Sequence, residues 1–511
     1  MKLIHLTAKT SAFTMIVAGA LAVTGCADGY DSPEGFDLGV RNAQMESPDS
    51  ISFLVSTDGE SATVSWAVVP GAQGHEVTFM NVDDPQNPVI VDGYDKKIVD
   101  GSKFTVTVAE DSKYQMLIRT LGNKNLNNKD AVEAKTFDFS TLVPSVMTIP
   151  SGSDIYEYIQ EHPLDSVGGE VAIDLEPGGT YTLTGQVDFR YQQLTFRGDK
   201  VNWPTVNVVG NGSFATYGGL KFKFLKVDMT EATAQSFIFM SPNPPDEIKC
   251  ENLPGYVGEK LSKGTYMVEQ PVYLAHCWFK NLPHSMLHDN SVNCAFWYFT
   301  VSDCIVQMNN TTNSNVGFVN LYQAGKSVKN ILIEKSTIYN IVDNDAACFI
   351  RYQNESNSQP EKTYGTFNSE YQSHGWKFLN STLAKCYTGW RFCNNVRGND
   401  FTLNIDHTIF YNVAQLYRMT GMGSKTFRFN FFWNDKQDDK DRNNSATDTN
   451  KAPFASEYEP QFGGNSEATV AQELDLTKPN GGVDFTPKEY QIVMNRAGDP
   501  RWLPSAASTE E

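Results

Sequence analysis

The sequence lacks the features of several common protein classes. Its apolar run near the N-terminus, SAFTMIVAGALAV, is too short to span a bilayer. Positive charge is scarce, because 41 Lys and Arg residues stand against 60 Asp and Glu residues, which gives a net charge of −19. No segment clusters Lys and Arg densely enough for phosphate binding, so the composition excludes nucleic acid as a partner.

Paired cysteines are also missing. Besides Cys26 the chain has seven cysteines, an odd number at irregular spacing, and none of them forms a CxxC pair. This pattern argues against both a disulfide framework and a zinc site. The seven lie at positions 250, 277, 294, 304, 348, 386 and 393.

The N-terminus carries an export signal. Lys2 and Lys9 precede the short apolar run, which ends in small residues and Cys26. The stretch VTGC resembles the cleavage site of bacterial lipoproteins, whose acylated cysteine supplies membrane affinity without a transmembrane helix. We therefore expect residues 1–25 to be a signal peptide and Cys26 to be the lipid attachment site. The alternative is an ordinary signal peptide with an incidental cysteine.

The residues after the signal are acidic. Residues 26–48 begin CADGYDSPEGFD, with four carboxylates in twelve residues. This segment resembles the export signal of Bacteroidetes-type surface lipoproteins. The resemblance implies a lipid-anchored protein at the cell surface, on the outer face of the outer membrane.

Residues 49–142 predict a small β-sandwich. Short alternating strands such as SATVSWAVV and KFTVTV are separated by turn residues. Trp66, the turn at Pro70-Gly71 and Tyr114 resemble a fibronectin type III domain, with Trp66 in the core and Tyr114 at a tyrosine corner. Such modules usually act as spacers.

Residues 146–505 predict one short helix followed by many strands. The segment SDIYEYIQEH fits an amphipathic helix with Ser153 or Asp154 as its N-cap. No further clear helix follows, and an internal repeat takes its place. Six segments align: HCWFKN, DCIVQM, KSTIYN, NSTLAK, HTIFYN and FNFFWN, beginning at residues 276, 303, 335, 380, 407 and 429.

The repeat predicts interior columns. One aligned position is always small or polar, and the position two residues later is always apolar, so both face inward in a strand. Four of the six segments also carry Asn two residues further on, which suits a left-handed turn. The first set is Cys277, Cys304, Ser336, Ser381, Thr408 and Asn430. The second is Phe279, Val306, Ile338, Leu383, Phe410 and Phe432, and the Asn set is Asn281, Asn340, Asn412 and Asn434.

These repeats resemble the right-handed parallel β-helix of pectate-lyase-like proteins. The fold class is therefore all-β, with the helix near Ser153 capping the open end and a C-terminal cap. The closing sequence VDFTPKEYQIVMNRAGDPRW is similar to the ends of Bacteroidetes surface lipoproteins associated with polysaccharide uptake.

A column of arginines is predicted on one outer face. Arg391 follows Ser381 by ten residues. Arg418 follows Thr408 by the same ten, so both arginines occupy the same place in successive coils.

Two earlier coils extend this column. Arg351 lies fifteen residues after Ser336 in a lengthened coil, and the equivalent place one coil earlier is Asn320. Apolar residues flank each of them, so strand alternation turns the flanks inward and the polar side chains outward. The result is a ladder with neighbouring backbones ~4.8 Å apart.

The ladder has two interpretations. Arginines in register repel one another by about 1 kcal/mol per pair at ~5 Å in water, and Asp345, Asp400 or Asp406 could compensate this locally. Alternatively the ladder binds the carboxylates or sulfates of an extended acidic glycan through bidentate contacts. The glycan-binding candidates are Asn320, Arg351, Arg391 and Arg418. Tyr364 and Tyr371, in a long insertion beside the column, either stack on sugar rings or are ordinary exposed loop residues.

The resemblance also raises lyase chemistry. Lyases of this fold abstract a uronate proton with Arg or Lys while a cation such as calcium neutralises the carboxylate, which makes Arg351 and Arg391 the catalytic candidates. A deprotonated Arg is hard to arrange because its pKa is far above neutrality. Asp343 and Asp345 are candidate calcium ligands or an ordinary turn.

A second metal hypothesis joins His284 and His288 with His276 and Asp289, although PHSMLHDN also fits a plain loop.

Three functions follow from the sequence. The first is a surface lipoprotein that binds an acidic polysaccharide within a glycan-utilisation system, with outer-membrane import proteins as partners. The second is a polysaccharide lyase acting on a uronate-containing glycan, and the third is a structural or adhesive surface protein without a catalytic site.

Overall fold

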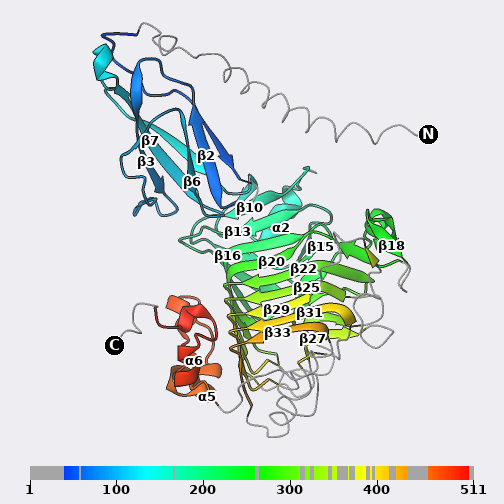
Figure 1. The fold of residues 1–511 in the computed structure, drawn as a ribbon. Helices are drawn as coiled ribbons and strands as arrows, with labels where there is room; N and C mark the ends of the chain where they lie inside the picture. Colours follow the sequence, from blue (N-terminus) through cyan, green and yellow to red (C-terminus); the bar gives the residue numbers. More distant parts are fainter. Residues whose placement is uncertain are drawn as a thin grey trace, which may run out of the picture. The chain divides into compact units, whose positions relative to one another are not determined.

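The chain forms two compact units, Met1–Leu142 and Val143–Glu511. The computed structural model describes residues 40–56, 59–164, 167–258, 264–310, 317–322, 327–342, 348–353, 366–367, 375–386, 392–393, 398–413, 422–434 and 458–505 (Figure 1). Within those ranges no helix is both long enough and apolar enough to cross a membrane.

Unit 1 is an antiparallel sandwich of two sheets around one core. Alternate residues of its strands point inward, and Trp66 and Phe79 of the two sheets lie in the same buried cluster. The Tyr114 hydroxyl accepts a hydrogen bond from the Ala109 amide at 2.7 Å, as in a tyrosine corner. One sheet contains β1 (Ile51–Val55), β2 (Ser61–Trp66) and β6 (Lys103–Thr107). The other contains β3 (Ala72–Asn81), β4 (Val89–Ile90), β5 (Lys97–Val99), β7 (Lys113–Gly122) and β8 (Lys135–Ser140), and the 3-10 helix η2 (Lys124–Leu126) follows β7.

Unit 2 is a parallel β-helix with three faces (Figure 1). The first face contains β9 (Ser145–Ile149), β10 (Val171–Leu175), β13 (Leu194–Arg197), the first parts of β16 (Leu220–Ala232) and β20 (Val272–Leu282), β19 (Tyr266–Val268), β22 (Cys294–Ser302), β25 (Ser327–Glu334), β29 (Gly375–Leu379), β31 (Gly398–Asp406) and β33 (Met422–Arg428).

The second face contains β11 (Thr180–Leu183), β14 (Thr205–Gly210), the later parts of β16 and β20, β23 (Ile305–Met308), β26 (Thr337–Asn340), β30 (Thr382–Ala384), β32 (Ile409–Tyr411) and β34 (Phe431–Trp433). The third face is a six-stranded sheet of β12 (Gln186–Asp188), β15 (Ser213–Thr216), β17 (Ser236–Met240), β21 (Ser285–His288), β24 (Gly317–Tyr322) and β27 (Cys348–Gln353). A separate antiparallel pair joins β18 (Tyr256–Gly258) to β28 (Thr366–Phe367), and the 3-10 helices η3 (Asp246–Ile248) and η4 (Cys250–Asn252) precede β18.

The predicted interior columns are confirmed. Phe279 pairs with Val306, and Ile338, Leu383, Phe410 and Phe432 continue the same register. All six side chains are completely buried. The small or polar column is buried too, and it is linked by hydrogen bonds such as Cys304 N–H to Ser336 Oγ at 3.0 Å and Ser336 N–H to Ser381 Oγ at 3.3 Å.

The predicted left-handed turn occurs in some of the coils. Of the four aligned Asn residues, only Asn281 and Asn412 have positive φ, at 55° and 50°. Lys385, at the same aligned position as the Asn residues, also has a positive φ of 50°. A more regular left-handed residue precedes the small or polar column, where the chain turns from the first face to the second. The corner residues are Phe224, His276, Asp303, Lys335, Asn380, His407 and Phe429, with φ between 46° and 59°. Position in the coil therefore determines this turn, whatever the residue type.

A short helix covers the N-terminal end of the coil stack, as predicted. Helix α2 (Ile155–Glu161) begins after Asp154, whose carboxylate accepts the Glu157 N–H at 3.0 Å. Ile155 and Ile159 face inward and join the main core of the β-helix.

The C-terminal segment, residues 458–505, lies along the side of the β-helix. We expected a cap over the end, but this segment packs on the outer surface of the second face. The reason is that this surface is apolar: Ile305, Tyr339, Ile409, Tyr411 and Phe431 share a buried cluster with Phe462, Leu474, Phe485 and Trp502. Its helices are η7 (Phe462–Gly464), α5 (Ser466–Val470), η8 (Pro479–Gly482), α6 (Tyr490–Met494) and η9 (Pro500–Trp502).

The seven cysteines of the described chain are free and buried. Cys277 and Cys304 occupy the interior column, as expected for small core residues. Burial raises the pKa of Cys250 to about 12, and it also raises the pKa values of Cys304 and Cys386.

Candidate functional site

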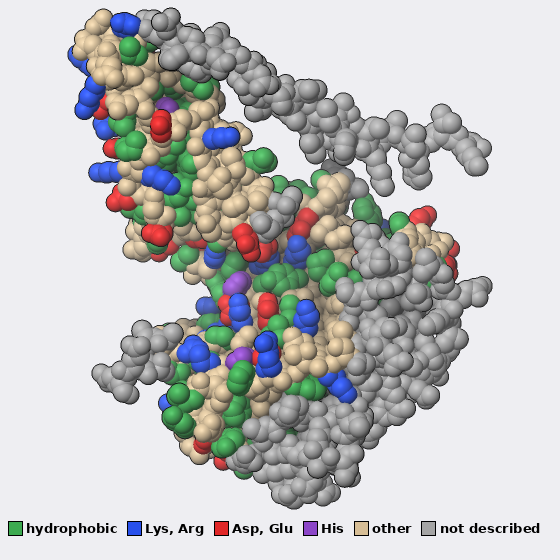
Figure 2. Space-filling model, in the orientation of Figure 1, with side chains coloured by type: hydrophobic (Ala, Val, Ile, Leu, Met, Phe, Trp, Pro, Cys, Tyr) green, Lys and Arg blue, Asp and Glu red, His purple; other side chains and the backbone are tan. Residues whose placement is uncertain are grey.

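Charged side chains on the outer surface of the first face form ion pairs with one another. Figure 2 shows basic and acidic side chains interspersed over these strands, with no large area of one sign. Asp174 binds Arg197 at 2.6 Å, and Glu170 binds Lys221 at 2.7 Å. Charges that are paired in this way contribute little to the binding of a charged polymer.

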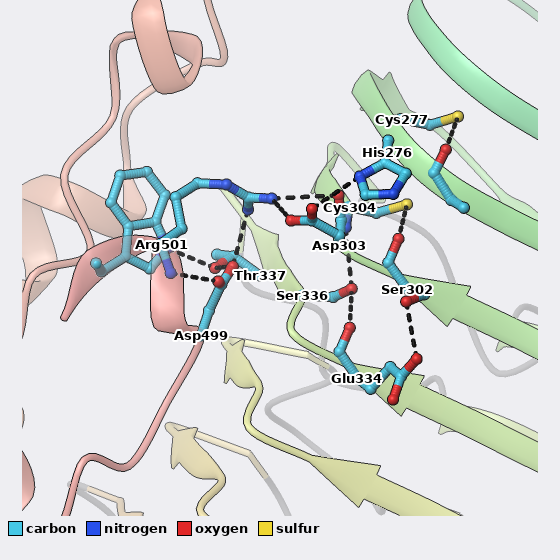
Figure 3. A network of polar contacts seen from close by, with 12 residues as sticks. His276, Cys277, Ser302, Asp303, Cys304, Glu334, Ser336, Thr337, Asp499 and Arg501 are labelled. Carbon is cyan, nitrogen blue, oxygen red and sulfur yellow. Dashed lines mark hydrogen bonds and ion pairs between the residues drawn. The ribbon is translucent and has the colours of Figure 1, made fainter. Parts of the chain in front are cut away.

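A network of polar contacts joins the C-terminal segment to the second face (Figure 3). We call this network the C-terminal clip, and its members are Asp303, Thr337, Asp499, Arg501 and Trp502. The Arg501 guanidinium binds Asp499 at 2.8 Å and also binds Asp303. Thr337 donates to Asp499 at 2.8 Å and accepts from the indole N–H of Trp502 at 2.7 Å. Every member therefore has a partner across the contact between the segment and the strands.

The two carboxylates of the clip differ in their titration. Burial raises the pKa of Asp499 to about 6, although Arg501 and Thr337 act in the opposite direction. Burial also acts on Asp303, but its hydrogen bond with His276 and the charge of Arg501 outweigh this and lower its pKa. Because Asp499 is wholly buried and fully bonded, we assign the clip a structural role.

The third face carries a different outward column. The register places Ala215 beside Asp188 and Phe239 beside Ala215. His288, Asn320 and Arg351 continue the same line. We call these six residues the outer column.

Three consecutive members of the outer column carry hydrogen-bond donors. Asn320 pairs directly with Arg351, as the sequence predicted, and His288 precedes them. The two predicted residues are not freely exposed, however, since Asn320 is 6% and Arg351 is 8% accessible. Their side chains are held against neighbouring groups, which is typical of preorganised binding groups as well as of structural ones.

The next step of the predicted ladder is wrong in register. We expected Ile350 beside Trp390, which would place Arg351 beside Arg391. Instead Ile350 pairs with Cys393, and the ring of Phe349 stacks on Phe392 at 4.9 Å. The interior aromatic stack agrees with this register, in which Ile350 pairs with Cys393.

Several predicted site residues lie outside the described residues. They are Arg391, Arg418, Tyr364, Tyr371, Asp343, Asp345 and Cys26. Their assignments stay predictions.

The histidine hypothesis is not supported by the geometry. No group of three or more His, Cys, Asp or Glu side chains within the described ranges could hold a metal ion. His276 is instead bound to Asp303 at 2.8 Å, at the corner between the first two faces.

The turn after β21 is strained and orders His288. Asn290 and Ser291 are consecutive residues with φ of 51° and 62°. The Asn290 N–H donates to His288 Nδ1 at 2.9 Å, and the Ser291 N–H donates to Asp289 at 2.7 Å. A neutral His288 ring therefore carries its proton on Nε2. Sequence reasoning missed this residue in the column; the alternation of SMLH in a strand was the available signal.

Lys329 is a buried lysine on the first face. The Lys329 ammonium lies 4.0 Å from the ring centre of Trp297, and burial lowers its pKa to about 8. Such a lysine has the pKa of a proton-abstracting base. Its side chain is completely covered, however, so packing explains it better than catalysis does.

Two family models match parts of the chain, and neither has an assigned function. The family model DUF4992, a domain of unknown function, matches residues 1–183. A second, DUF4957, also a domain of unknown function, matches residues 179–341. No curated protein matches the chain.

Similar solved structures include enzymes that act on polysaccharides. The PL6 family alginate lyase AlyGC is 12% identical with a TM-score of 0.33, over 62% of this chain and 45% of the lyase. The family 28 exopolygalacturonase of Yersinia enterocolitica is 11% identical with a TM-score of 0.18, over 77% and 83%. The pectate lyase PelI of Erwinia chrysanthemi, solved with tetragalacturonic acid, is 7% identical with a TM-score of 0.14, over 70% and 85%. The chain thus spans less than half of the alginate lyase, and likenesses with such low TM-scores carry no argument about this chain.

Proposed function

We propose that the protein binds an acidic polysaccharide along the third face of its β-helix. The observation that carries this proposal is the run of donors at His288, Asn320 and Arg351 in neighbouring strands. Neighbouring strands of a sheet are ~4.8 Å apart, so the three groups form a line that suits an extended polymer. Arg351 supplies the fixed positive charge that a carboxylate or sulfate requires.

The same geometry favours binding over proton abstraction. A general base needs an available lone pair, but His288 Nδ1 already accepts the Asn290 N–H. Asp188 is the carboxylate of the outer column, and it lies five strands from Arg351, or roughly 24 Å at the backbone. It is therefore too far away to act on a sugar unit held by Arg351.

The cellular setting belongs to the same proposal. The lipoprotein-like signal and the acidic segment after Cys26 support a lipid-anchored protein on the outer membrane that presents the β-helix to extracellular glycan. Outer-membrane glycan-import proteins would then be its partners. A Cys26→Ala variant is expected to leave the membrane fraction, and unchanged detergent partitioning would contradict the anchor.

Arg351→Ala tests the binding site. A charge-assisted hydrogen bond contributes ~1.5 to 3 kcal/mol, so retention on polygalacturonate or alginate in affinity electrophoresis should weaken roughly ten- to a hundredfold. Salt should weaken it further, since the Debye length is about 8 Å at physiological ionic strength. Arg428→Ala is the matched control, because Arg428 is an exposed arginine on the first face that pairs with Asp406.

The alternatives give different results in the same variants. A purely structural Arg351 would lower the melting temperature and leave retention unchanged, which would remove the binding site. Release of unsaturated uronate products by the wild-type protein, followed by their absorbance, would instead establish a lyase.

A further inference from the structure

A pocket lies at the corner where the chain leaves the third face. It has a volume of about 400 Å³, and Tyr191, Tyr217, Glu269 and Gln270 contribute polar side chains to its wall. Met267 and Ile248 add apolar surface. Tyr191 is 54% exposed, and together with Gln192 it also lines a neighbouring hollow of about 280 Å³.

The backbone around this pocket is rigid. The Gln192 side chain bonds to Gly169 O at 3.0 Å and to the Val167 N–H at 3.2 Å, which holds two parts of the pocket wall together. The opposite side is held by close packing, because a Cβ on Gly218 would lie 2.1 Å from Tyr191 O. The pocket is therefore formed before any ligand enters.

The polar side chains of the wall have no hydrogen-bond partner among the described residues. In the part of the chain that the structure describes, no hydrogen bond or ion pair is made by the side chains of Tyr191, Tyr217, Glu269 or Gln270. The neighbouring Glu170 gives the contrast, since it is bound by Lys221 at 2.7 Å and by Thr195. Glu269 is partly exposed, so its carboxylate is open to solvent and available to a ligand that enters the pocket.

The chemistry of the wall limits that ligand. Tyrosine rings stack on the C–H faces of sugars, while hydroxyls, an amide and a carboxylate bind sugar hydroxyl groups. Burial raises the pKa of Glu269, and no cation of the described residues pairs with it, so a further negative charge is disfavoured beside it. A uronate or sulfate would meet repulsion there.

We propose that this corner pocket binds an uncharged pyranose unit, with Tyr191 stacking on the ring and Glu269 accepting hydrogen bonds from its hydroxyls. This goes beyond acidic-polysaccharide binding at the outer column, because it is a second site that prefers an uncharged sugar. A polymer carrying both neutral and acidic sugars could occupy the two sites together.

Saturation-transfer NMR of the full chain tests the pocket with free monosaccharides. Glucose, galactose, mannose and xylose are the uncharged probes, galacturonate is the acidic probe and galactosamine the cationic one. We expect at least one uncharged sugar to bind, and Tyr191→Ala to abolish its signal. Tyr490→Ala, which removes an equally exposed tyrosine from the C-terminal segment, should keep the signal.

Glu269→Gln separates a binding role from a structural one. Loss of a charge-assisted hydrogen bond should weaken the uncharged sugar about tenfold, while the melting temperature stays unchanged or rises because a buried charge has been removed. A fall in melting temperature with unchanged sugar binding would overturn the assignment. So would the absence of any signal from the four uncharged sugars, or stronger signals from galacturonate or galactosamine.

Arg351→Ala keeps the two proposals apart. It should leave the uncharged sugar signal intact even where it abolishes retention on polygalacturonate. If the sugar signal is lost together with that retention, the corner pocket is not an independent site.

Discussion

Two carboxylates of the β-helix both have raised pKa values but differ in their hydrogen-bond and ion-pair partners. Asp499 is completely buried, and Arg501, Thr337 and the backbone N–H of Arg501 bind it from several sides. Glu269 is only half-buried, yet it has no partner within the described residues. Burial raises the pKa of both, so the pKa shift alone does not distinguish them. Their partners distinguish them. Asp499 is hydrogen-bonded and ion-paired and stabilises the fold, whereas Glu269 is proposed to bind a ligand.

The largest expected effect concerns Asp499, the carboxylate with several partners. Arg501→Met leaves Asp499 buried without its cation, and removal of one partner from a buried ion pair typically costs ~3 to 5 kcal/mol. Hydrogen exchange of residues 458–505 should accelerate accordingly. Arg496→Met is the control, because Arg496 bonds only to the exposed Pro504 carbonyl at 3.1 Å. Equal protection in both variants would show that the clip contributes little.

The next effect is a pH dependence of the same contact. The pKa of Asp499 rises from 3.8 to about 6, roughly two units, or about 3 kcal/mol. Between these values the folded segment keeps a proton that the unfolded segment has lost, so stability falls as pH rises through this window. Asp303 opposes this only at lower pH, because its pKa is lowered and its stabilising effect is lost below about 4.

Hydrogen exchange at pH 4.5 and pH 7, corrected for intrinsic rates, measures this dependence. The wild-type C-terminal segment should be better protected at pH 4.5, and Asp499→Asn should flatten the difference. A difference of the same size in Asp499→Asn would assign it to another group.

The smallest expected effect concerns the corner pocket that contains Glu269. Gly218→Ala forces a Cβ against the Tyr191 carbonyl, and overpacking of this kind costs ~1 to 3 kcal/mol. Gly168→Ala, on the rim of the same pocket, meets nothing within 4 Å and should change stability little. Urea unfolding midpoints compare the two. Identical midpoints would show that the wall around Tyr191 yields, and that the pocket is less rigid than its contacts indicate.

The sequence predicted the interior of the β-helix better than its surface. The column from Phe279 to Phe432 was predictable because a strand repeats its inward positions at i and i+2, and every coil has to fill the same core. The left-handed position predicted at the aligned Asn residues is confirmed at Asn281 and Asn412, but the more regular left-handed corner precedes the small or polar column. His276, Asp303 and Lys335 adopt that conformation there, since the bend between two strands imposes it.

The outer sites were harder to predict because they depend on register between coils of unequal length. Counting residues aligned Arg351 with Arg391, but the insertion between their coils shifts the pairing so that Ile350 meets Cys393. The corner pocket has no motif at all. Tyr191 and Tyr217 are 26 residues apart and Glu269 follows 52 residues later, each within an ordinary turn, and only the stacking of coils brings them together.

The buried thiols have a consequence for the time before the protein is folded. Disulfide exchange requires an accessible thiolate, and burial with raised pKa values removes both conditions from Cys250, Cys304 and Cys386. If the chain is exported as proposed, folding would therefore protect these thiols from wrong cross-links in an oxidising compartment. The rate at which the coils close would then limit the yield of correctly folded protein more than its final stability does.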